Sequence, residues 1–325
     1  FSAKKYDQES FTQWADSSLK FSFFDVPLDK HSVKLTQGYQ AVCAFVNDDL
    51  SQPVLADLKA MGIGIIALRC AGFNQVDLAA ANHLGIQVAR VPAYSPHAVA
   101  EHALALILTL NRRTHRAFNR TREGDFSLHG LTGFDLHGKS VGIIGAGQIG
   151  LTFARIMAGF GCQLLINDPR PVANLAGLGA RQVELDELIE RSDIISLHCP
   201  LNAATHHLIN APRLQQMKAG VMLINTGRGA LIDTPALIGA LKSGQLGYLG
   251  LDVYEEEAEL FYEDHSDLPL QDDVLARLLS FPNVLITAHQ AFLTHEALAA
   301  IAATTRDNIA AWLAGTPINL VHASA

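Results

Sequence analysis

The chain has 325 residues, of which 49% are hydrophobic and 17% are charged, and its formal net charge at pH 7 is −8. This length exceeds the usual size of one domain, and the composition is typical of an ordered globular enzyme with two hydrophobic cores. The negative net charge argues against a broad surface for the phosphate backbone, so we expect no nucleic-acid partner.

The cysteines and the apolar stretches exclude further classes of protein. The four cysteines, at positions 43, 70, 162 and 199, lie far apart and form no CxxC pair. We therefore expect no metal site, no disulfide framework and a reducing, cytoplasmic environment. No apolar stretch reaches the roughly eighteen residues of a membrane span, so no membrane partner is expected. The opening residues 1–7 read as the end of a strand, which predicts that a few residues precede them.

Between residues 40 and 92, short apolar runs alternate with amphipathic segments of helical length. The runs at 40–46, 63–72 and 86–92 predict strands joined by helices, which is the pattern of a parallel sheet with crossover helices. Prolines at positions 92 and 96 interrupt this pattern. A long apolar helix is expected immediately afterwards, from His97 to Phe118, and we place a crossing between two domains there.

A second series of apolar runs begins near residue 138 and continues to residue 290. It predicts six strands separated mostly by helices, as in a doubly wound dinucleotide-binding domain. The alanine-rich tail from Leu293 to Trp312 has helical spacing and no strand to pair with, so we expect a helix that returns to the first domain. The six expected strands lie within residues 138–145, 162–168, 193–200, 220–227, 246–253 and 283–290.

A glycine-rich motif follows the first strand of this second series. Residues 145–150 read GAGQIG, between an expected strand and an expected helix. In this context the GxGxxG pattern is the fingerprint of a dinucleotide cofactor, whose pyrophosphate lies at the N-terminus of the helix. Gly145 permits the tight turn, Gly147 lets the backbone approach the pyrophosphate, and Gly150 lets helix and strand pack closely.

Asp168 stands at the end of the next expected strand, where the fingerprint requires an acidic residue. Its carboxylate is expected to accept hydrogen bonds from the adenosine ribose and to repel a 2′-phosphate, which selects NAD over NADP. The alternative is an aspartate that only stabilises the turn before Pro169. Arg170 is near enough in the sequence to neutralise part of the repulsion, which leaves NADP open as a second cofactor.

Three later strand ends carry ionisable residues: Arg228, a run of glutamates at 255–257, and His289. In an open α/β sheet, ligands bind beyond the carboxyl ends of the strands. A cation, a carboxylate and a histidine there suit hydride transfer to a 2-oxo acid, because the substrate needs a positive charge and the forming alkoxide needs a proton. The alternatives are an ordinary surface ion pair for Arg228 and a buried structural role for His289.

Five motifs in the same order carry a resemblance to a known family. They are GAGQIG with Asp168, HCPL at 198–201, NTGRGALID at 225–233, LDVYEEE at 251–257 and TAHQAF at 287–292. The chain resembles the D-isomer-specific 2-hydroxyacid dehydrogenase family over essentially its whole length. Within that family, the fermentative D-lactate dehydrogenase branch is resembled by RCAGFNQVD at 69–77, VPAYSPHAVAEH at 91–102, LTGFDLHGK at 131–139 and HQAFLT at 289–294.

The resemblance implies an α/β fold with two Rossmann-like or flavodoxin-like domains, each built on a parallel sheet. The substrate-binding (catalytic) domain is expected to be discontinuous in sequence, formed by residues 1–95 and 293–325. The NAD-binding Rossmann domain is expected at residues 96–292. A homodimer or homotetramer is also implied.

By this resemblance, Arg228 holds the substrate carboxylate and polarises the carbonyl, while His289 protonates the alkoxide as NADH gives hydride to C2. The family motif places the acidic partner of His289 five residues after Asp252, which selects Glu257 from the run of glutamates. Spacing alone does not choose among them, because such a run is usually a solvated face. Glu257 is expected to orient His289 and to favour its protonated form.

The resemblance also implies contacts to the substrate and the cofactor. The backbone N–H groups of Ala71 and Gly72 are expected to bind the substrate carboxylate, with a tight turn that binds no ligand as the alternative. Tyr94 is expected to hydrogen-bond the substrate and Phe292 to close the side near C3; a domain-junction aromatic and a core aromatic are the alternatives. Besides Asp168 and the three glycines, the expected cofactor contacts are Val99, Gln148, Ile149, His198, Cys199, Pro200, Thr205, Thr226, Gly227 and Asp252. The alternative for Val99 is a purely structural role in the core beside its helix. Cys199 is not interpreted as a nucleophile.

These features together imply the reversible, NAD-dependent reduction of pyruvate to D-lactate. The expected partner is a small 2-oxo or 2-hydroxy acid. A hydroxypyruvate or glyoxylate reductase is the nearest alternative among enzymes. An NAD(H)-sensing, corepressor-like protein is the alternative from another class, and the acidic net charge favours the enzyme over it.

Overall fold

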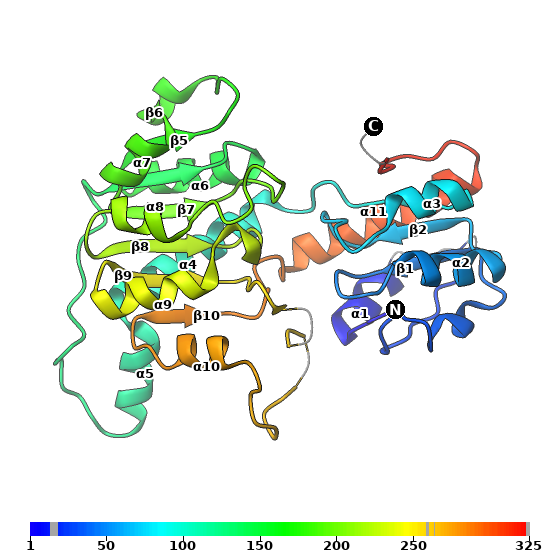
Figure 1. The fold of residues 1–325 in the computed structure, drawn as a ribbon, viewed down its shortest axis with the longest axis horizontal. Coiled ribbons are helices and arrows are strands. Elements are labelled where there is room, and N and C mark those ends of the chain that lie inside the picture. Colours follow the sequence, from blue (N-terminus) through cyan, green and yellow to red (C-terminus); the bar gives the residue numbers. More distant parts are fainter. Residues whose placement is uncertain (14–18, 258–259, 263, 323–325) are drawn as a thin grey trace. The chain divides into compact units, whose positions relative to one another are not determined.

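The computed structural model describes residues 1–13, 19–257, 260–262 and 264–322 (Figure 1). The contacts within the chain divide it into two compact units, Phe1–Ser95 with Leu293–Ala325, and Pro96–Phe292. Each unit has its own parallel sheet and its own hydrophobic core. The α/β fold with parallel sheets, predicted from the alternation of apolar runs and helical segments, is therefore confirmed.

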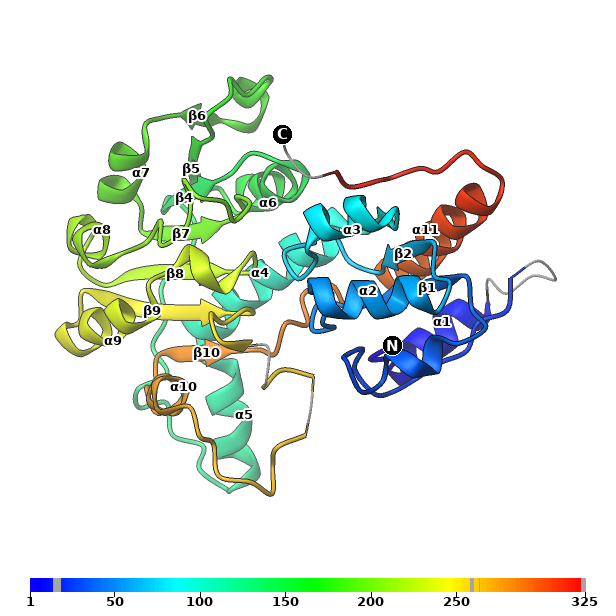
Figure 2. The ribbon, with the colours of Figure 1, turned by 45° about the vertical axis from the view of Figure 1, so that its right-hand side comes forward.

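The first unit is built on a three-stranded parallel sheet in the order β1-β2-β3. Helix α11 packs against the central strand β2 and against α1, so residues from the two ends of the sequence meet beside the sheet (Figure 2). The elements of this unit are α1 (Lys5–Thr12), a short 3-10 helix (Val33–Thr36), β1 (Ala41–Ala44), α2 (Gln52–Ala60), β2 (Ile65–Leu68), α3 (Leu78–Leu84), β3 (Gln87–Ala89) and α11 (His295–Leu313).

Helix α11 corresponds to the alanine-rich tail that was predicted to be helical. It begins after Thr294, whose hydroxyl oxygen accepts a hydrogen bond from the backbone N–H of Ala297 at 3.2 Å and so caps the helix. Near the other end of α11, the ring of Trp312 packs onto Gly64, just before β2. A Cβ atom added at Gly64 would lie 2.3 Å from the Trp312 ring, so this contact requires a glycine.

The opening segment differs from its prediction. Residues 1–7 were expected to end a strand, but Lys5–Thr12 form helix α1. The carboxylate of Asp7 accepts a hydrogen bond from the backbone N–H of Lys4 at 3.0 Å, which satisfies a donor at the start of the helix. Asp7 also pairs with the buried guanidinium of Arg69, whose Nε lies 3.2 Å from Asp7 Oδ1. This pair anchors α1 to the end of β2.

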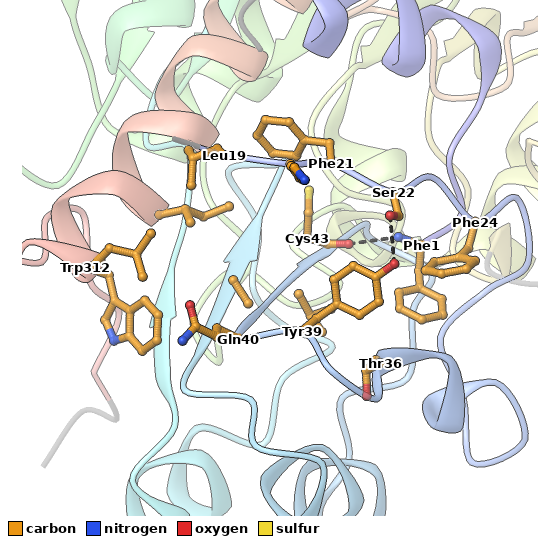
Figure 3. A pocket seen from close by; sticks show the side chains of 15 residues that line it. Phe1, Leu19, Phe21, Ser22, Phe24, Thr36, Tyr39, Gln40, Cys43 and Trp312 are labelled. Carbon is orange, nitrogen blue, oxygen red and sulfur yellow. Dashed lines mark hydrogen bonds between the residues drawn. The ribbon is translucent and has the colours of Figure 1, made fainter. Parts of the chain in front are cut away.

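A cavity of about 210 Å³ lies in the first unit, between β1, residues 19–24 and α11 (Figure 3). Its walls are mainly apolar and include Phe21 and Trp312. The amino group of Phe1 donates a hydrogen bond to the carbonyl oxygen of Cys43 at 3.0 Å, and this contact lies in the wall. The expected site residues do not line this cavity.

The second unit holds a seven-stranded parallel sheet in the order β10-β9-β8-β7-β4-β5-β6. The six predicted strands are present, and β6 was missed because its residues, Ala-Arg-Gln, contain no apolar run. The strand order reverses between β4 and β7, which is where open α/β sheets bind their ligands. The strands are β4 (Ser140–Ile144), β5 (Gln163–Asn167), β6 (Ala180–Gln182), β7 (Ile194–Leu197), β8 (Val221–Asn225), β9 (Leu246–Leu251) and β10 (Val284–Ile286).

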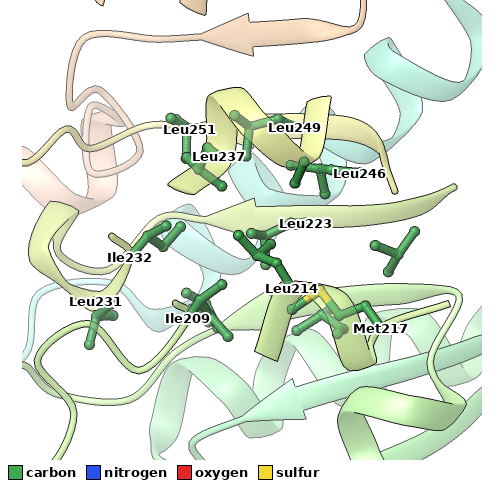
Figure 4. Packing of buried hydrophobic residues seen from close by; sticks show 14 of the residues in the cluster. Ile209, Leu214, Met217, Leu223, Leu231, Ile232, Leu237, Leu246, Leu249 and Leu251 are labelled. Atoms are coloured by element: carbon green, nitrogen blue, oxygen red, sulfur yellow. The ribbon is translucent and has the colours of Figure 1, made fainter. Parts of the chain in front are cut away.

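Helices cover both faces of this sheet and bury one hydrophobic cluster on each. Helices α4 (Pro96–Arg112) and α6 (Gln148–Gly159) pack on one face. The other face carries α7 (Leu185–Arg191), α8 (Ala211–Gln216), α9 (Thr234–Ser243) and α10 (Asp273–Leu279). The hydrophobic cluster on that face includes Leu237 of α9 together with Leu223 of β8 and Leu249 of β9 (Figure 4). Strands β7 and β8 are buried along their whole length, as parallel strands between helical layers usually are.

The long helix predicted from His97 to Phe118 is two helices, so that prediction is wrong in its length. Helix α4 ends at Arg112, and α5 (Thr114–Arg122) follows after Arg113, which has φ +51° in the left-handed region. The buried side chain of Asn111 holds the end of α4 by two hydrogen bonds of 2.8 Å with the backbone of Phe134. In the part of the chain that the structure describes, no helix has both the length and the apolar character needed to cross a bilayer.

Candidate active site

The glycine motif forms the turn between β4 and α6. Gly145 has φ +100°, and a Cβ atom there would lie 2.6 Å from the backbone nitrogen of Cys199. A Cβ atom at Gly150 would lie 2.0 Å from the carbonyl oxygen of Gly145, so the close packing of helix and strand excludes any side chain. Two of the three glycines are therefore required by the protein's own backbone.

Gly147 differs from the other two glycines because no atom lies within 4 Å of the position of its Cβ. It is the N-cap residue of α6, and no side chain caps this helix. The backbone N–H groups of the first turn, at Gln148 and Ile149, therefore face open space at the positive end of the helix. This arrangement fits the pyrophosphate of a dinucleotide, which such helix ends bind.

Asp168 follows β5 and lies directly over the glycine turn. Its Oδ2 accepts a hydrogen bond from the backbone N–H of Ala146 at 2.9 Å, and its Oδ1 accepts one from the N–H of Arg170 at 3.0 Å. Burial alone would raise the pKa of Asp168, but these hydrogen bonds and the charge of Arg170 outweigh it and lower the pKa. The carboxylate is thus ionised, and the side chain of Arg170 is 84% exposed at 3.6 Å from it.

The loop after β8 presents a buried polar atom without a partner. Thr226 is 8% exposed, and its hydroxyl forms no hydrogen bond with any residue that the structure describes. The loop around it is rigid, because Asn225 accepts a hydrogen bond from the N–H of Gly227 and donates one to the carbonyl oxygen of Arg228, at 3.0 and 2.9 Å. Buried hydroxyl groups are normally satisfied, so the orphaned Thr226 hydroxyl fits a group of the bound cofactor.

Burial determines the protonation of the two residues that follow β7, His198 and Cys199. The ring of His198 points into the protein, where Nε2 lies 2.9 Å from Ser196 Oγ and the ring packs against Phe153. Burial lowers the pKa of His198 to about 4, so the ring is neutral. Burial is also the main reason that the pKa of Cys199 is raised to about 11, which excludes a thiolate nucleophile at neutral pH.

Thr205 closes the loop that starts at Pro200. Its hydroxyl donates a hydrogen bond of 2.6 Å to the carbonyl oxygen of Pro200 and accepts one of 2.8 Å from the backbone N–H of Asn202. The side chain of Thr205 is therefore already engaged in shaping the loop. Both Pro200 and Thr205 lie beyond the carboxyl end of β7, at the edge of the sheet where the glycine turn also lies.

Arg228 lies beyond the carboxyl end of β8 and is half-buried. Its Nη1 donates a hydrogen bond of 2.8 Å to the carbonyl oxygen of Gly227, and no carboxylate of a described residue forms an ion pair with it. The neighbouring Gly229 packs on backbone, since a Cβ atom there would lie 2.1 Å from the carbonyl carbon of Tyr254. The guanidinium therefore carries a positive charge that a substrate carboxylate can balance.

His289 and Glu257 form a hydrogen bond of 2.8 Å between Nδ1 and Oε1. Their side chains are 16% and 18% exposed, so the pair is partly shielded from water. The second carboxylate oxygen of Glu257 accepts the backbone N–H of Tyr254 at 2.9 Å, which fixes its orientation. Since Nδ1 is engaged, Nε2 of His289, which has no partner among the described residues, is the atom that can give or take a proton.

The other glutamates of the run point elsewhere. Glu255 Oε1 lies 2.6 Å from Nε2 of His207, away from His289. Glu256 is exposed. The structure therefore brings Glu257, and neither of its two neighbours, to His289.

Asp252 supports the loop that carries His289. It is fully buried, and its two carboxylate oxygens accept the backbone N–H groups of Gln290 and Ala291, both at 2.9 Å. Thr287 donates its hydroxyl to the same carboxylate, and Nε2 of His102 lies 3.3 Å away. Burial would raise the pKa of Asp252, but these hydrogen bonds lower it. The cofactor contact expected of Asp252 stays a prediction, and in the structure its carboxylate holds the loop in position.

His289 adopts an unusual backbone conformation that this support explains. Its φ is +50°, in the left-handed region that residues other than glycine rarely adopt. Its backbone N–H donates to the carbonyl oxygen of Asp252 at 2.7 Å, and the hydroxyl of Tyr262 donates to its carbonyl oxygen at 3.3 Å. Left-handed backbone at a functional residue persists only when the surroundings hold it in place.

The remaining expected residues lie in loops or at the ends of the units. Ala71 and Gly72 follow β2, and their N–H groups donate to no acceptor in the described part of the chain. Tyr94 is half-buried in the segment after β3. Val99 and Phe292, at the two ends of the second unit, are 4% and 8% exposed.

Sequence reasoning missed His102 and Thr287, whose side chains meet at 3.0 Å beside Asp252. They are 185 positions apart, so no local pattern could pair them. His102 lies inside the motif at 91–102 and Thr287 begins the motif at 287–292, and their place in these motifs was the available signal. Tyr262, whose ring lies 5.9 Å from that of His289, was missed for the same reason.

Comparison with known proteins agrees with this site. Residues 104–291 match the model of the D-isomer specific 2-hydroxyacid dehydrogenase, NAD binding domain. A D-lactate dehydrogenase of Escherichia coli (strain K12) is 54% identical over 310 residues, which cover 95% of this chain and 94% of the relative. The structure of a pyruvate reductase of Chlamydomonas reinhardtii superposes with a TM-score of 0.92 at 45% identity, covering 98% of this chain and 96% of that one.

A third similar protein is described with its ligands. The structure of a D-lactate dehydrogenase from Aquifex aeolicus complexed with NAD and lactic acid has a TM-score of 0.88 to this chain at 34% identity. The match covers 100% of this chain and 98% of that one. The chain therefore belongs to the D-isomer specific 2-hydroxyacid dehydrogenase family, whose members are NAD-dependent oxidoreductases. Within the family it belongs to the D-lactate dehydrogenase branch.

Proposed function

We propose that this protein interconverts pyruvate and D-lactate with NAD(H). The observation that carries the proposal is the pairing of His289 with Glu257 at 2.8 Å, beside the strand end that bears the unpaired Arg228. A proton donor and a cation are what the reduction of a 2-oxo acid requires. The relatives named D-lactate dehydrogenase and pyruvate reductase support pyruvate as the substrate.

In this mechanism the guanidinium of Arg228 binds the pyruvate carboxylate and polarises the C2 carbonyl. Bound NADH supplies the hydride that C2 accepts. As charge develops on the carbonyl oxygen, Nε2–H of His289 donates its proton, and the Glu257 carboxylate holds the ring in place through Nδ1. In the oxidation of D-lactate, the neutral Nε2 accepts the hydroxyl proton and Arg228 keeps the carboxylate in place.

The cofactor residues are assigned on the same basis. The first turn of α6, beside the open space at Gly147, holds the pyrophosphate, and the buried Thr226 hydroxyl bonds the cofactor further along the sheet edge. Asp168 accepts the ribose hydroxyl groups and disfavours a 2′-phosphate, which makes NAD the preferred cofactor. Arg170 is exposed and already pairs with Asp168, so it offsets this preference only in part.

Residues of the first unit and residues of the second unit are proposed to contact the substrate and the nicotinamide. We assign residues 1–95 and 293–325 to the substrate domain and residues 96–292 to the NAD-binding domain. The N–H groups of Ala71 and Gly72 and the hydroxyl of Tyr94 are proposed contacts to the substrate. Val99 and Phe292 are proposed apolar neighbours of the nicotinamide and of the C3 group.

A steady-state screen of pyruvate, hydroxypyruvate, glyoxylate, oxaloacetate and phenylpyruvate with NADH tests this function. We expect the highest kcat/KM for pyruvate and a product that is D-lactate alone. A clear preference for hydroxypyruvate or glyoxylate, or formation of L-lactate, contradicts the proposal. Light scattering on the same sample tests the homodimer or homotetramer that the resemblance predicts.

A further inference from the structure

A group of potential metal ligands lies outside the residues that the proposed reaction uses. Among the described residues, His206, His207 and Glu255 offer ligand atoms that all lie within 4.8 Å of one another. The two histidines belong to the loop between β7 and α8, and the glutamate follows β9. We propose that these side chains form a binding site for a divalent transition-metal ion of the Zn²⁺ class.

The local backbone brings the two consecutive histidines together. Side chains of neighbouring residues diverge in regular helices and strands. Here His207 has φ +48°, in the left-handed region, and the two imidazole rings lie 4.0 Å apart with an interplanar angle of 26°. The backbone N–H of His207 donates to the carbonyl oxygen of Ala230 at 2.8 Å, which holds the turn in place. The paired rings are therefore a built feature of this loop.

The chemistry of the group selects the kind of ion. Two imidazole nitrogens and one carboxylate oxygen are typical ligands of zinc and similar transition metals, whereas Mg²⁺ and Ca²⁺ prefer oxygen ligands alone. Glu255 supplies the negative charge, and its second carboxylate oxygen accepts the backbone N–H of Thr234 at 3.5 Å. With three protein ligands, a water molecule completes a tetrahedral coordination shell.

Only small movements are needed to admit the ion. Ligand atoms in a tetrahedral zinc site lie roughly 3.3 Å apart. His207 Nε2 and Glu255 Oε1 are now 2.6 Å apart, so the ion replaces their hydrogen bond and separates them slightly. The exposed ring of His206 rotates out of its stacking with His207 to direct a nitrogen at the ion. Both partners of the existing hydrogen bond thus become ligands, and neither is left buried without a partner.

Binding of Zn²⁺ to the full-length protein tests the site directly. We expect a single ion per chain in a titration against a zinc-sensitive chelating dye, and a visible absorption spectrum of tetrahedral cobalt when Co²⁺ is used. Removing one ligand should weaken zinc binding by roughly tenfold or more. The variants are His206→Asn, which changes an exposed side chain, and His207→Asn, with thermal unfolding in the absence of metal to check the fold.

A matched control separates this site from general binding by surface histidines. His129 is exposed in the second unit and lies outside the cluster, so His129→Asn should bind zinc as tightly as the wild type. Equal binding by the wild type and by both His206→Asn and His207→Asn overturns the proposal, because the ion then lies elsewhere. Loss of binding in His129→Asn, or no stoichiometric binding by the wild type, overturns it as well. None of these outcomes depends on which oxo acid the enzyme reduces.

Discussion

The Nδ1 atom of His289 lies 2.8 Å from Oε1 of Glu257, although the two residues are 32 positions apart in the sequence. This contact fixes which ring nitrogen can exchange a proton with a substrate, because the other nitrogen stays with the carboxylate. The carboxylate in turn is fixed by the backbone N–H of Tyr254. The orientation of His289 is therefore controlled by one acidic side chain.

Replacing Glu257 with Gln should lower kcat for pyruvate reduction. The charge-assisted hydrogen bond that holds Nδ1 of His289 becomes a weaker, neutral one, so the ring presents Nε2 to the substrate less reliably. Pyruvate binding should remain largely intact, because Arg228 carries that contact, so KM should change little in steady-state kinetics. Replacing His289 with Gln should instead abolish turnover.

The run of glutamates supplies the control for this experiment. Glu256 is exposed, so Glu256→Gln should leave kcat for pyruvate reduction unchanged. An unchanged kcat in Glu257→Gln, or an equal fall in Glu256→Gln, contradicts the pairing that the structure indicates.

Replacing Arg228 with Gln should lower kcat/KM for pyruvate by about 100-fold or more, since the cation contacts both the carboxylate and the developing charge on the carbonyl oxygen. Arg228→Lys should recover part of the loss, because it keeps the charge but not the planar, bidentate geometry. Steady-state kinetics with pyruvate measure both variants. Arg170→Gln, which removes an exposed arginine of the cofactor loop, should leave the KM for pyruvate unchanged.

Replacing Asp168 with Asn should relax the discrimination against NADPH. The amide oxygen can still accept the N–H of Ala146, so the glycine turn is kept while the charge is removed. We expect the ratio of kcat/KM for NADPH over NADH to rise roughly tenfold, the effect of removing one repulsive charge near a protein surface. Asp186→Asn, an exposed charge change on α7, is the control. An unchanged ratio in Asp168→Asn contradicts the proposed ribose contact.

Much of the fold could be predicted because its signals are local. The run at 221–225 is buried along its whole length, and a continuous apolar run is what a strand between two helical layers requires. The glycine motif was equally readable, since Gly145 and Gly150 are required by close contacts within the turn. Strand β6 escaped prediction because it is short, polar and at the edge of the sheet.

The features that local patterns could not reveal are those that depend on distant pairs. The break at Arg113 lies beside Asn111, whose side chain bonds the backbone of Phe134 from 23 positions away, and helix propensity gives no sign of it. The carboxylate of Asp252 supports the His289 loop by accepting the backbone N–H groups of Gln290 and Ala291, which are 38 and 39 positions away in the sequence. The sequence placed Asp252 at the site but could not distinguish a contact to a ligand from support of a loop.

Replacing Asp252 with Asn should affect turnover more than substrate binding. An Asn side chain has only one oxygen that can accept hydrogen bonds, so one of the two backbone N–H groups at Gln290 and Ala291 loses its buried acceptor. We expect the free energy of unfolding to fall by about 1–3 kcal/mol and kcat to fall more than KM rises. His102→Gln, which removes a weaker contact to the same carboxylate, should give a smaller effect of the same kind. Equal kcat in Asp252→Asn and the wild type contradicts the positioning role.

The final prediction concerns His198 and the stability of the protein in mild acid. Burial lowers the pKa of His198 from 6.5 to about 4, so the folded protein keeps this ring neutral where the unfolded chain protonates it. Because the unfolded state binds more protons in this interval, the free energy of unfolding should decrease as the pH falls from about 7 towards 4. His198 should account for about 2 kcal/mol of that decrease between pH 7 and pH 5.

His198→Gln removes the titrating group and keeps a polar side chain that can reach Ser196, so the free energy of unfolding of this variant should depend less on pH. Urea unfolding at both pH values measures this, with His129→Gln as a control that retains the wild-type dependence. The same pH dependence in His198→Gln and the wild type shows that the ring titrates equally in both states, which contradicts its burial as a neutral group.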